Sequence, residues 1–173
     1  MLNKIMSYCA CGVVGMLVGC QPANQQQTST SKESAIVPVK EIKIVVKKVK
    51  FENSDDQPAS PSQLCWALFA GPDGFPSDSS KVVRSGCIDV NGSIHVFRIS
   101  DLPPSQSGYV VSLFQDMNLN GKLDTRKFFG FDIPDEPFGF TKNPSLMGAP
   151  TFEKCKINPT TEGEEFVIEM KTM

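Results

Sequence analysis

The stretch "GYVVSLFQDMNLNGKLD", residues 108–124, contains two different structural signals in direct succession. Residues 108–114 are apolar at both odd and even positions, which is typical of a strand that is buried on both faces. Residues 116–124 are polar and include the turn-forming pair Asn120-Gly121. The sequence therefore predicts a central strand that runs directly into a surface loop.

Other segments between residues 39 and 173 also show strand periodicity. Ile42, Ile44 and Val46 alternate with lysines, and Phe166, Ile168 and Met170 alternate near the C-terminus. Asn91-Gly92 lies between two further strand-like segments and predicts a hairpin. The remaining strands are expected in the segments 64–70, 81–90, 93–99 and 151–157. No window shows a long amphipathic helix, so we expect an all-β, Ig-like or prealbumin-like β-sandwich of about seven strands.

Residues 115–150 form a long connection without an obvious regular element, and such connections are usually functional. Oxygen-bearing side chains occupy the first, third, fifth and ninth positions of residues 116–124, and a glycine is sixth. Calcium prefers oxygen ligands. We expect a calcium loop whose ligands are Asp116, Asn118, Asn120, the backbone carbonyl of Lys122, and Asp124.

The calcium pattern is incomplete at its twelfth position, which is occupied by Lys127. A carboxylate from Asp132, Asp135 or Glu136 would have to close the site. The alternative is a tight turn at Asn120-Gly121, with the side chains of the loop capping backbone amides.

The N-terminus has the features of a targeting segment. A basic residue, Lys4, precedes an apolar stretch, which ends in "LVGC" at residues 17–20. This resembles the lipobox of bacterial lipoproteins, so residues 1–19 are expected to be a signal peptide and Cys20 to carry a lipid. Residues 20–38 are then a flexible tether, because they are almost devoid of large apolar residues. Gln21 after the cysteine implies a lipid anchor in the outer membrane of the cell envelope.

Three of the six cysteines fall within the domain expected at residues 39–173. Cys65, Cys87 and Cys155 allow three different single disulfides. We prefer Cys65–Cys87, which would contribute about 3 kcal/mol to stability. The alternative is that all three are buried, reduced thiols.

Residues 108–157 carry motifs that identify the chain as similar to a known family. These are "GYVVSLFQDMNLNGKLD", "FGFDIPDEPFGFTKNP" and "GAPTFEKCKI". In this order they resemble the bacterial exported proteins of the family named domain of unknown function 2141. The resemblance implies a secreted or surface-attached β-sandwich without an assigned reaction. Gln115 is a departure, because many members carry a histidine at that position.

Few residues suggest catalysis. The chain lacks Gly-x-Ser-x-Gly, His-Glu-x-x-His and phosphate-binding glycine motifs, and His95 is its only histidine. A net charge of −2 gives no reason to expect nucleic acid as a partner. We therefore expect that the protein is not an enzyme.

Two functions remain open. The first is a calcium-stabilised structural or interaction module, anchored to the membrane by lipid and contacting an unknown envelope protein. The second is a protein that binds a small ligand or glycan through the loop at residues 128–144. Aromatic side chains folded inward, with no pocket, would favour the first function. An exposed aromatic platform or a concave pocket beside that loop would favour the second.

Overall fold

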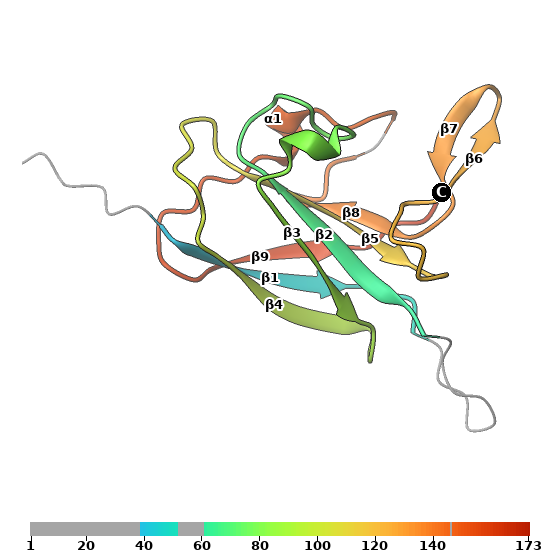
Figure 1. The fold of residues 1–173 in the computed structure, drawn as a ribbon, viewed down its shortest axis with the longest axis horizontal. Helices are drawn as coiled ribbons and strands as arrows, with labels where there is room; N and C mark the ends of the chain where they lie inside the picture. Colours follow the sequence, from blue (N-terminus) through green and yellow to red (C-terminus); the bar gives the residue numbers. More distant parts are fainter. Residues whose placement is uncertain (1–38, 52–60, 146) are drawn as a thin grey trace, which may run out of the picture. The chain divides into compact units, whose positions relative to one another are not determined.

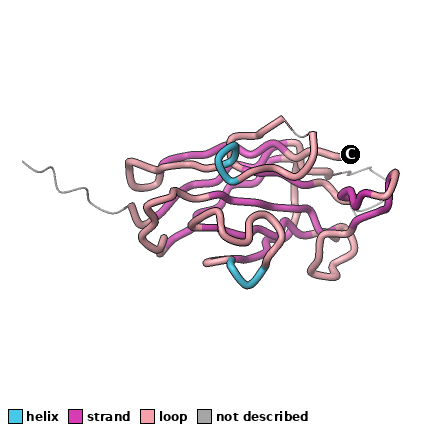
Figure 2. Tube along the Cα trace, turned by 90° about the horizontal axis from the view of Figure 1, so that it is seen from above, coloured by secondary structure: helices cyan, strands magenta, loops and turns pink. Residues whose placement is uncertain are grey.

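The computed structural model describes residues 39–51, 61–145 and 147–173. Two β-sheets are stacked as the layers of a sandwich, and a separate two-stranded hairpin lies at one end (Figure 1). Helix is confined to two short segments among the described residues (Figure 2). The expected all-β sandwich is confirmed. The predicted signal peptide, lipidated cysteine and tether lie outside the described residues.

The first sheet has β1 at its centre. Its strand order is β4 (Ile94–Ser100), β1 (Glu41–Lys47) and β9 (Glu164–Glu169). β1 pairs antiparallel with β4 and parallel with β9. Ile42, Ile44 and Val46 of β1 are fully buried. Lys43, Val45 and Lys47 alternate with them and lie on the opposite face, because successive side chains of a strand alternate between faces.

The second sheet is antiparallel throughout. Its strand order is β3 (Arg84–Asp89), β2 (Gln63–Phe69), β5 (Val110–Asp116) and β8 (Phe138–Phe140). β5 lies between β2 and β8, which is the interior position expected from its sequence. Cys65 and Cys87 are directly opposite each other on β2 and β3 and form a disulfide. This is the pairing that we preferred from the sequence.

The main core lies between the two sheets. It contains Leu64 and Leu68 of β2 and Val111 and Leu113 of β5, packed with the buried residues of β1. Ile168 of β9 is fully buried and Met170 is nearly so, while Phe166 packs against the core from a half-buried position. The alternation read from the C-terminal segment therefore identified the correct face of β9.

Two expectations about the connections were wrong. Asn91-Gly92 does not close a hairpin, because β3 pairs with β2 in one sheet and β4 pairs with β1 in the other. Asn91 also lacks the positive φ that the first central residue of a type I′ or II′ hairpin turn requires. The connection from residue 115 to 150 is not without regular structure. It contains β6 (Thr125–Phe128), β7 (Phe131–Pro134) and β8.

The segment 151–157 was expected to be a strand, and this expectation was also wrong. Residues 152–155 form a single helical turn, α1 (Phe152–Cys155). Phe152 and Cys155 are both buried, and in a helix residues three positions apart lie on the same face. A further short 3₁₀ turn, η1 (Ser79–Lys81), lies in the connection between β2 and β3. No helix among the described residues has the length and apolar character needed to span a membrane.

Gly139 allows β8 to approach the other sheet closely. A Cβ atom at this position would lie 2.7 Å from Cγ2 of Ile168 in β9. That separation is well inside van der Waals contact, so the sheets would have to move apart to accommodate a methyl group.

We therefore predict that Gly139→Ala lowers the free energy of unfolding by about 1–3 kcal/mol. The matched control is Gly71→Ala, because no atom lies within 4 Å of the added Cβ there. Urea denaturation of both variants and the wild type would measure the effect. Equal stability of the two variants would contradict the close packing at Gly139.

Candidate functional site

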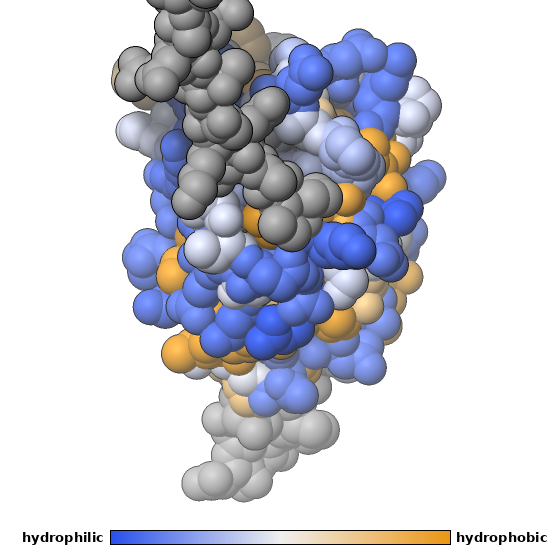
Figure 3. Space-filling model, turned by 90° about the vertical axis from the view of Figure 1, so that its left-hand side faces the viewer, coloured by the Kyte–Doolittle hydropathy of each residue, from blue (hydrophilic) through white to orange (hydrophobic). Residues whose placement is uncertain are grey.

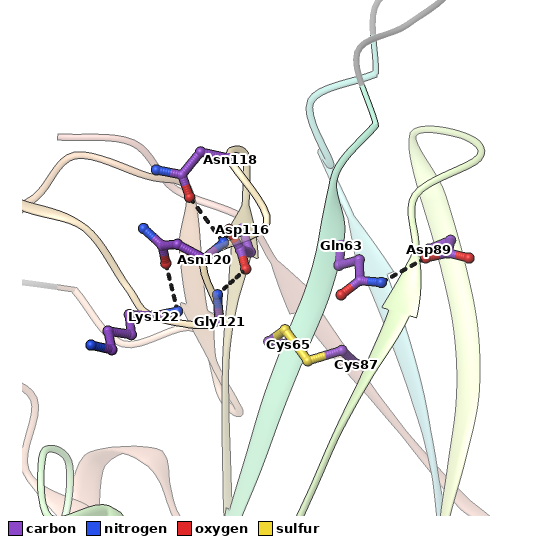
Figure 4. Close-up of a disulfide and its surroundings, with 9 residues drawn as sticks. All are labelled: Gln63, Cys65, Cys87, Asp89, Asp116, Asn118, Asn120, Gly121 and Lys122. Atoms are coloured by element: carbon purple, nitrogen blue, oxygen red, sulfur yellow. Dashed lines mark hydrogen bonds between the residues drawn. A yellow bond between two sulfur atoms is a disulfide. The ribbon is translucent and has the colours of Figure 1, made fainter.

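The loop after β5 is held together by its own side chains. Asp116 is 1% exposed, and its two carboxylate oxygens accept hydrogen bonds from the backbone N–H groups of Asn120 and Gly121 at 3.1 and 2.7 Å. Oδ1 of Asn118 also accepts from the N–H of Asn120, and Oδ1 of Asn120 accepts from the N–H of Lys122 (Figure 4). Side-chain oxygens thus cap three successive backbone amides.

Asp124 closes this loop from its other end. Its carboxylate accepts hydrogen bonds from Nδ2 of Asn118 and Nδ2 of Asn120, at 2.7 and 3.0 Å. The structure therefore brings together the four side chains proposed as calcium ligands. Their oxygens are engaged with amide donors, as the turn alternative describes. Nowhere in the described part of the chain do three His, Cys, Asp or Glu residues gather in a way that could hold a metal ion.

Glu136 joins the loop to the short segment between β7 and β8. It is 5% exposed, and its carboxylate accepts hydrogen bonds from the backbone N–H groups of Met117 and Asp124 at 2.7 and 3.0 Å. Of the three acids considered for closing the loop, Glu136 is the one whose carboxylate contacts it. Asp132 and Asp135 form exposed ion pairs with Lys127 and Arg126 instead.

A large groove lies on the outer face of the second sheet, beside this loop. It has a volume of about 1240 Å³ and is open to solvent. Its floor consists of residues that alternate outward along β2, β5 and β8, namely Cys65, Ala67, Phe69, Ser112, Phe114, Phe138 and Phe140. The disulfide forms part of this floor.

Three segments form the walls of the groove. The connection after β2 contributes Pro76 and Val82, and the segment 147–150 contributes another side. The β6–β7 hairpin contributes Phe128, Phe131 and Ile133. Lys122 and Asp132 also lie on the lining, so apolar side chains dominate but a charge of each sign is present.

A second apolar cluster lies on the same outer face of the second sheet and shares residues with the floor. Phe69, Val110, Phe152 and Cys155 are buried together in it, and Ala67 and Phe140 of the floor pack against them. Phe75 packs its ring edge to face against Phe69, Phe140 and Phe152, with centroid separations of 5.3 to 6.0 Å. Such contacts fix ring positions, so the floor is a preformed surface.

The end of the molecule opposite the hairpin has a different character. Polar residues predominate there, with apolar residues interspersed among them (Figure 3). The hairpin instead exposes three large rings, with Phe128 52%, Phe131 72% and Phe129 87% exposed.

The residues that could take part in catalysis are buried or engaged in hydrogen bonds and ion pairs. His95 is 7% exposed, and its Nε2 donates to the carbonyl oxygen of Gly92. Burial raises the pKa of the Cys155 thiol to about 11, so this thiol stays protonated at neutral pH. Glu136 and Asp135 diverge, since one is buried against the loop and the other lies in a surface ion pair.

Gln115 was not recognised from the sequence as a site residue. It is fully buried, and its side-chain amide bonds both the N–H and the carbonyl oxygen of Lys50, as well as Oγ of Ser62. It therefore ties β5 to the segment after β1. Its place one residue before the polar loop, in an otherwise apolar strand, was the available signal.

We predict that Glu136→Gln lowers the free energy of unfolding by about 1–3 kcal/mol, because one backbone N–H would then face an amide NH₂ group and lose its acceptor. Asp135→Asn is the matched control, since it removes only an exposed ion pair. Thermal and urea melts of both variants would measure the difference. If Glu136→Gln leaves the free energy of unfolding unchanged, the buried carboxylate does not hold the loop.

Comparison with known proteins agrees with the family resemblance of the motifs in residues 108–157. The family described as "Uncharacterized protein conserved in bacteria (DUF2141)" matches residues 55–166. That range includes β2, β5, the loop, the hairpin and most of the groove lining. No curated protein and no solved structure matches the chain. The match covers more than half of the sequence, and the chain therefore belongs to the DUF2141 family.

Proposed function

We propose that this protein is a non-enzymatic binding module of the bacterial cell envelope, and that the groove on its second sheet takes an uncharged, predominantly apolar ligand. The groove is the observation that carries this proposal. A concave pocket and exposed aromatic rings beside residues 128–144 are the features that favour ligand binding over a purely structural role.

The lining supports an apolar ligand rather than a glycan. Four of the seven floor residues are phenylalanines, at positions 69, 114, 138 and 140, and Ser112 is the polar side chain among the seven. Sugars are held by several converging hydrogen-bonding groups in addition to an aromatic face, and such a set is not gathered on this floor. The opposite charges of Lys122 and Asp132 do not favour a ligand of either sign.

The groove can be blocked at a defined position. Ser112 pairs with Ala67 on one side and Phe140 on the other, so Ser112→Glu would place a carboxylate at the centre of the floor. Val96→Glu is the control, because Val96 is 55% exposed on β4 of the other sheet.

We predict that the fluorescent apolar probe N-phenylnaphthylamine binds the wild type saturably, and that Ser112→Glu weakens this binding by roughly tenfold or more. Val96→Glu should bind like the wild type, and melts would verify that both variants are folded. Equal affinity of all three proteins would contradict binding in the groove. Saturable binding of oligosaccharides instead, lost in Ser112→Glu, would support the glycan alternative.

Calcium binding by the loop is a second part of the proposal. The observation that favours it is the burial of two carboxylates, Asp116 and Glu136, whose partners among the described residues are backbone amides rather than cationic side chains. A cation beside them would compensate negative charge that burial makes costly. Asn118, Asn120, Asp124 and the carbonyl oxygen of Lys122 would supply the other ligands.

We predict that millimolar calcium raises the melting temperature of the wild type, because it binds the folded state alone. Affinity should be around the 10⁻⁴–10⁻³ M of extracellular calcium modules, as few ligands are charged. Asp116→Asn should abolish the gain, with magnesium as the ionic control. If calcium and magnesium act equally on the wild type, the loop is a hydrogen-bonded turn without a specific metal.

The envelope location rests on the lipobox-like "LVGC" before the described residues. We predict that the mature protein begins at Cys20 with an attached diacylglycerol. Intact-mass measurement of protein extracted from membranes would reveal it. A free thiol at Cys20, or a chain that retains residues 1–19, would contradict the lipid anchor.

A further inference from the structure

The tip of the β6–β7 hairpin carries an aromatic residue that the fold does not require. Phe128 and Phe131 are paired across the hairpin, so Phe129 and Gly130 form a two-residue turn. Both have positive φ, at 48° and 85°, as in a type I′ turn. Asn, Asp and Gly favour such positions, whereas a bulky aromatic residue is strained there.

Packing does not explain Phe129 either. Its side chain is 87% exposed, and its nearest aromatic contact is edge to face with Phe128, itself 52% exposed. Neither backbone preference nor burial in this chain accounts for a phenyl ring at the tip. An external apolar phase would account for it, because burying an exposed ring is favourable.

Polarity changes in order along the hairpin. Three phenyl rings occupy the tip, and the next pair of residues, Lys127 and Asp132, forms an ion pair at 2.8 Å. Arg126 follows and pairs with Asp135 at 3.0 Å. The hairpin thus passes from apolar to charged within one step along its length, as the environment does at a membrane surface.

The shape of the hairpin suits contact with a lipid surface, which adapts to whatever enters it. β6 and β7 form a sheet of their own, and the hairpin extends outward beyond the sandwich (Figure 1). A projecting tip needs a matching cavity to dock on a protein, but it can enter lipid headgroups without one. The tip residues pair with each other across the turn, which limits the backbone groups that insertion would leave unsatisfied.

We propose that this hairpin is a membrane-contact element, which inserts the rings of Phe128, Phe129 and Phe131 into the interfacial region of a lipid bilayer. Phe128 and Phe131 also line the groove, whereas Phe129 does not, so Phe129 is the ring that is specific to the membrane contact. The contact does not require the lipid at Cys20. Since the charged residues behind the tip are paired, hydrophobic insertion rather than electrostatic attraction holds the hairpin at the surface.

A tryptophan reporter tests this contact locally in the full-length chain. Phe131→Trp places the reporter on the tip, and Ile94→Trp places it at a 59% exposed site on β4. The native Trp66 is present in both proteins and gives the same background. On addition of vesicles of phosphatidylethanolamine and phosphatidylglycerol, emission of the tip reporter should shift to the blue, with little dependence on salt, and emission of the β4 reporter should not.

Phe129→Asn in the Phe131→Trp protein separates membrane contact from folding. Asn is favoured at this turn position, so the melting temperature should stay the same or rise. The apparent partition onto vesicles reported by the tip tryptophan should fall by roughly ten- to a hundredfold, the equivalent of one buried ring. Ser112→Glu in the same background should leave the vesicle response unchanged, which distinguishes this contact from ligand binding in the groove.

Three results would overturn the proposal. The first is a tip reporter that does not respond to vesicles, and the second is a β4 reporter that responds equally. The third is a blue shift of the tip reporter that depends on protein concentration without lipid, which would indicate contact between copies of the chain.

Discussion

Burial of β5 on both of its faces is the constraint on which the rest of this structure depends. Val111, Leu113 and Gln115 point into the core between the sheets. On the outer face, Val110 packs in the second apolar cluster, while Ser112 and Phe114 form part of the floor of the groove. Asp116, the last residue of the strand, begins the loop by capping two of its amides. Core, groove and loop are therefore fixed relative to one another by seven consecutive residues.

Much of the fold could be predicted because strand burial leaves a period-two pattern in the sequence. β1 and β9 were located correctly for this reason, β5 was located by its continuous apolar run, and Cys65 and Cys87 occupied adjacent strand segments. Sheet membership left no such pattern. Asn91-Gly92 has the composition of a hairpin turn, but its flanking strands belong to different sheets. β3 pairs with β2 and β4 pairs with β1, instead of β3 and β4 pairing with each other.

The candidate site was only partly predictable. The loop residues share one short segment, so their proximity follows from spacing alone. The groove could not be predicted from spacing, because its lining is assembled from β2, β5, β8, the hairpin and the connection after β2. The short strands β6 and β7 carry no alternation, since six of their eight residues are exposed. The buried role of Glu136 depends on a contact with the loop twelve to nineteen residues earlier in the chain.

The parallel pairing of β1 with β9 has a consequence for how the molecule is made. β1 is the first strand of the described domain and β9 the last, yet they are neighbours in one sheet. A chain that emerges N-terminus first, from a ribosome or a translocation channel, therefore leaves one edge of β1 unpaired until β9 has emerged. Contacts of such large sequence separation form slowly. The first sheet therefore cannot be completed until β9 has emerged and paired with β1.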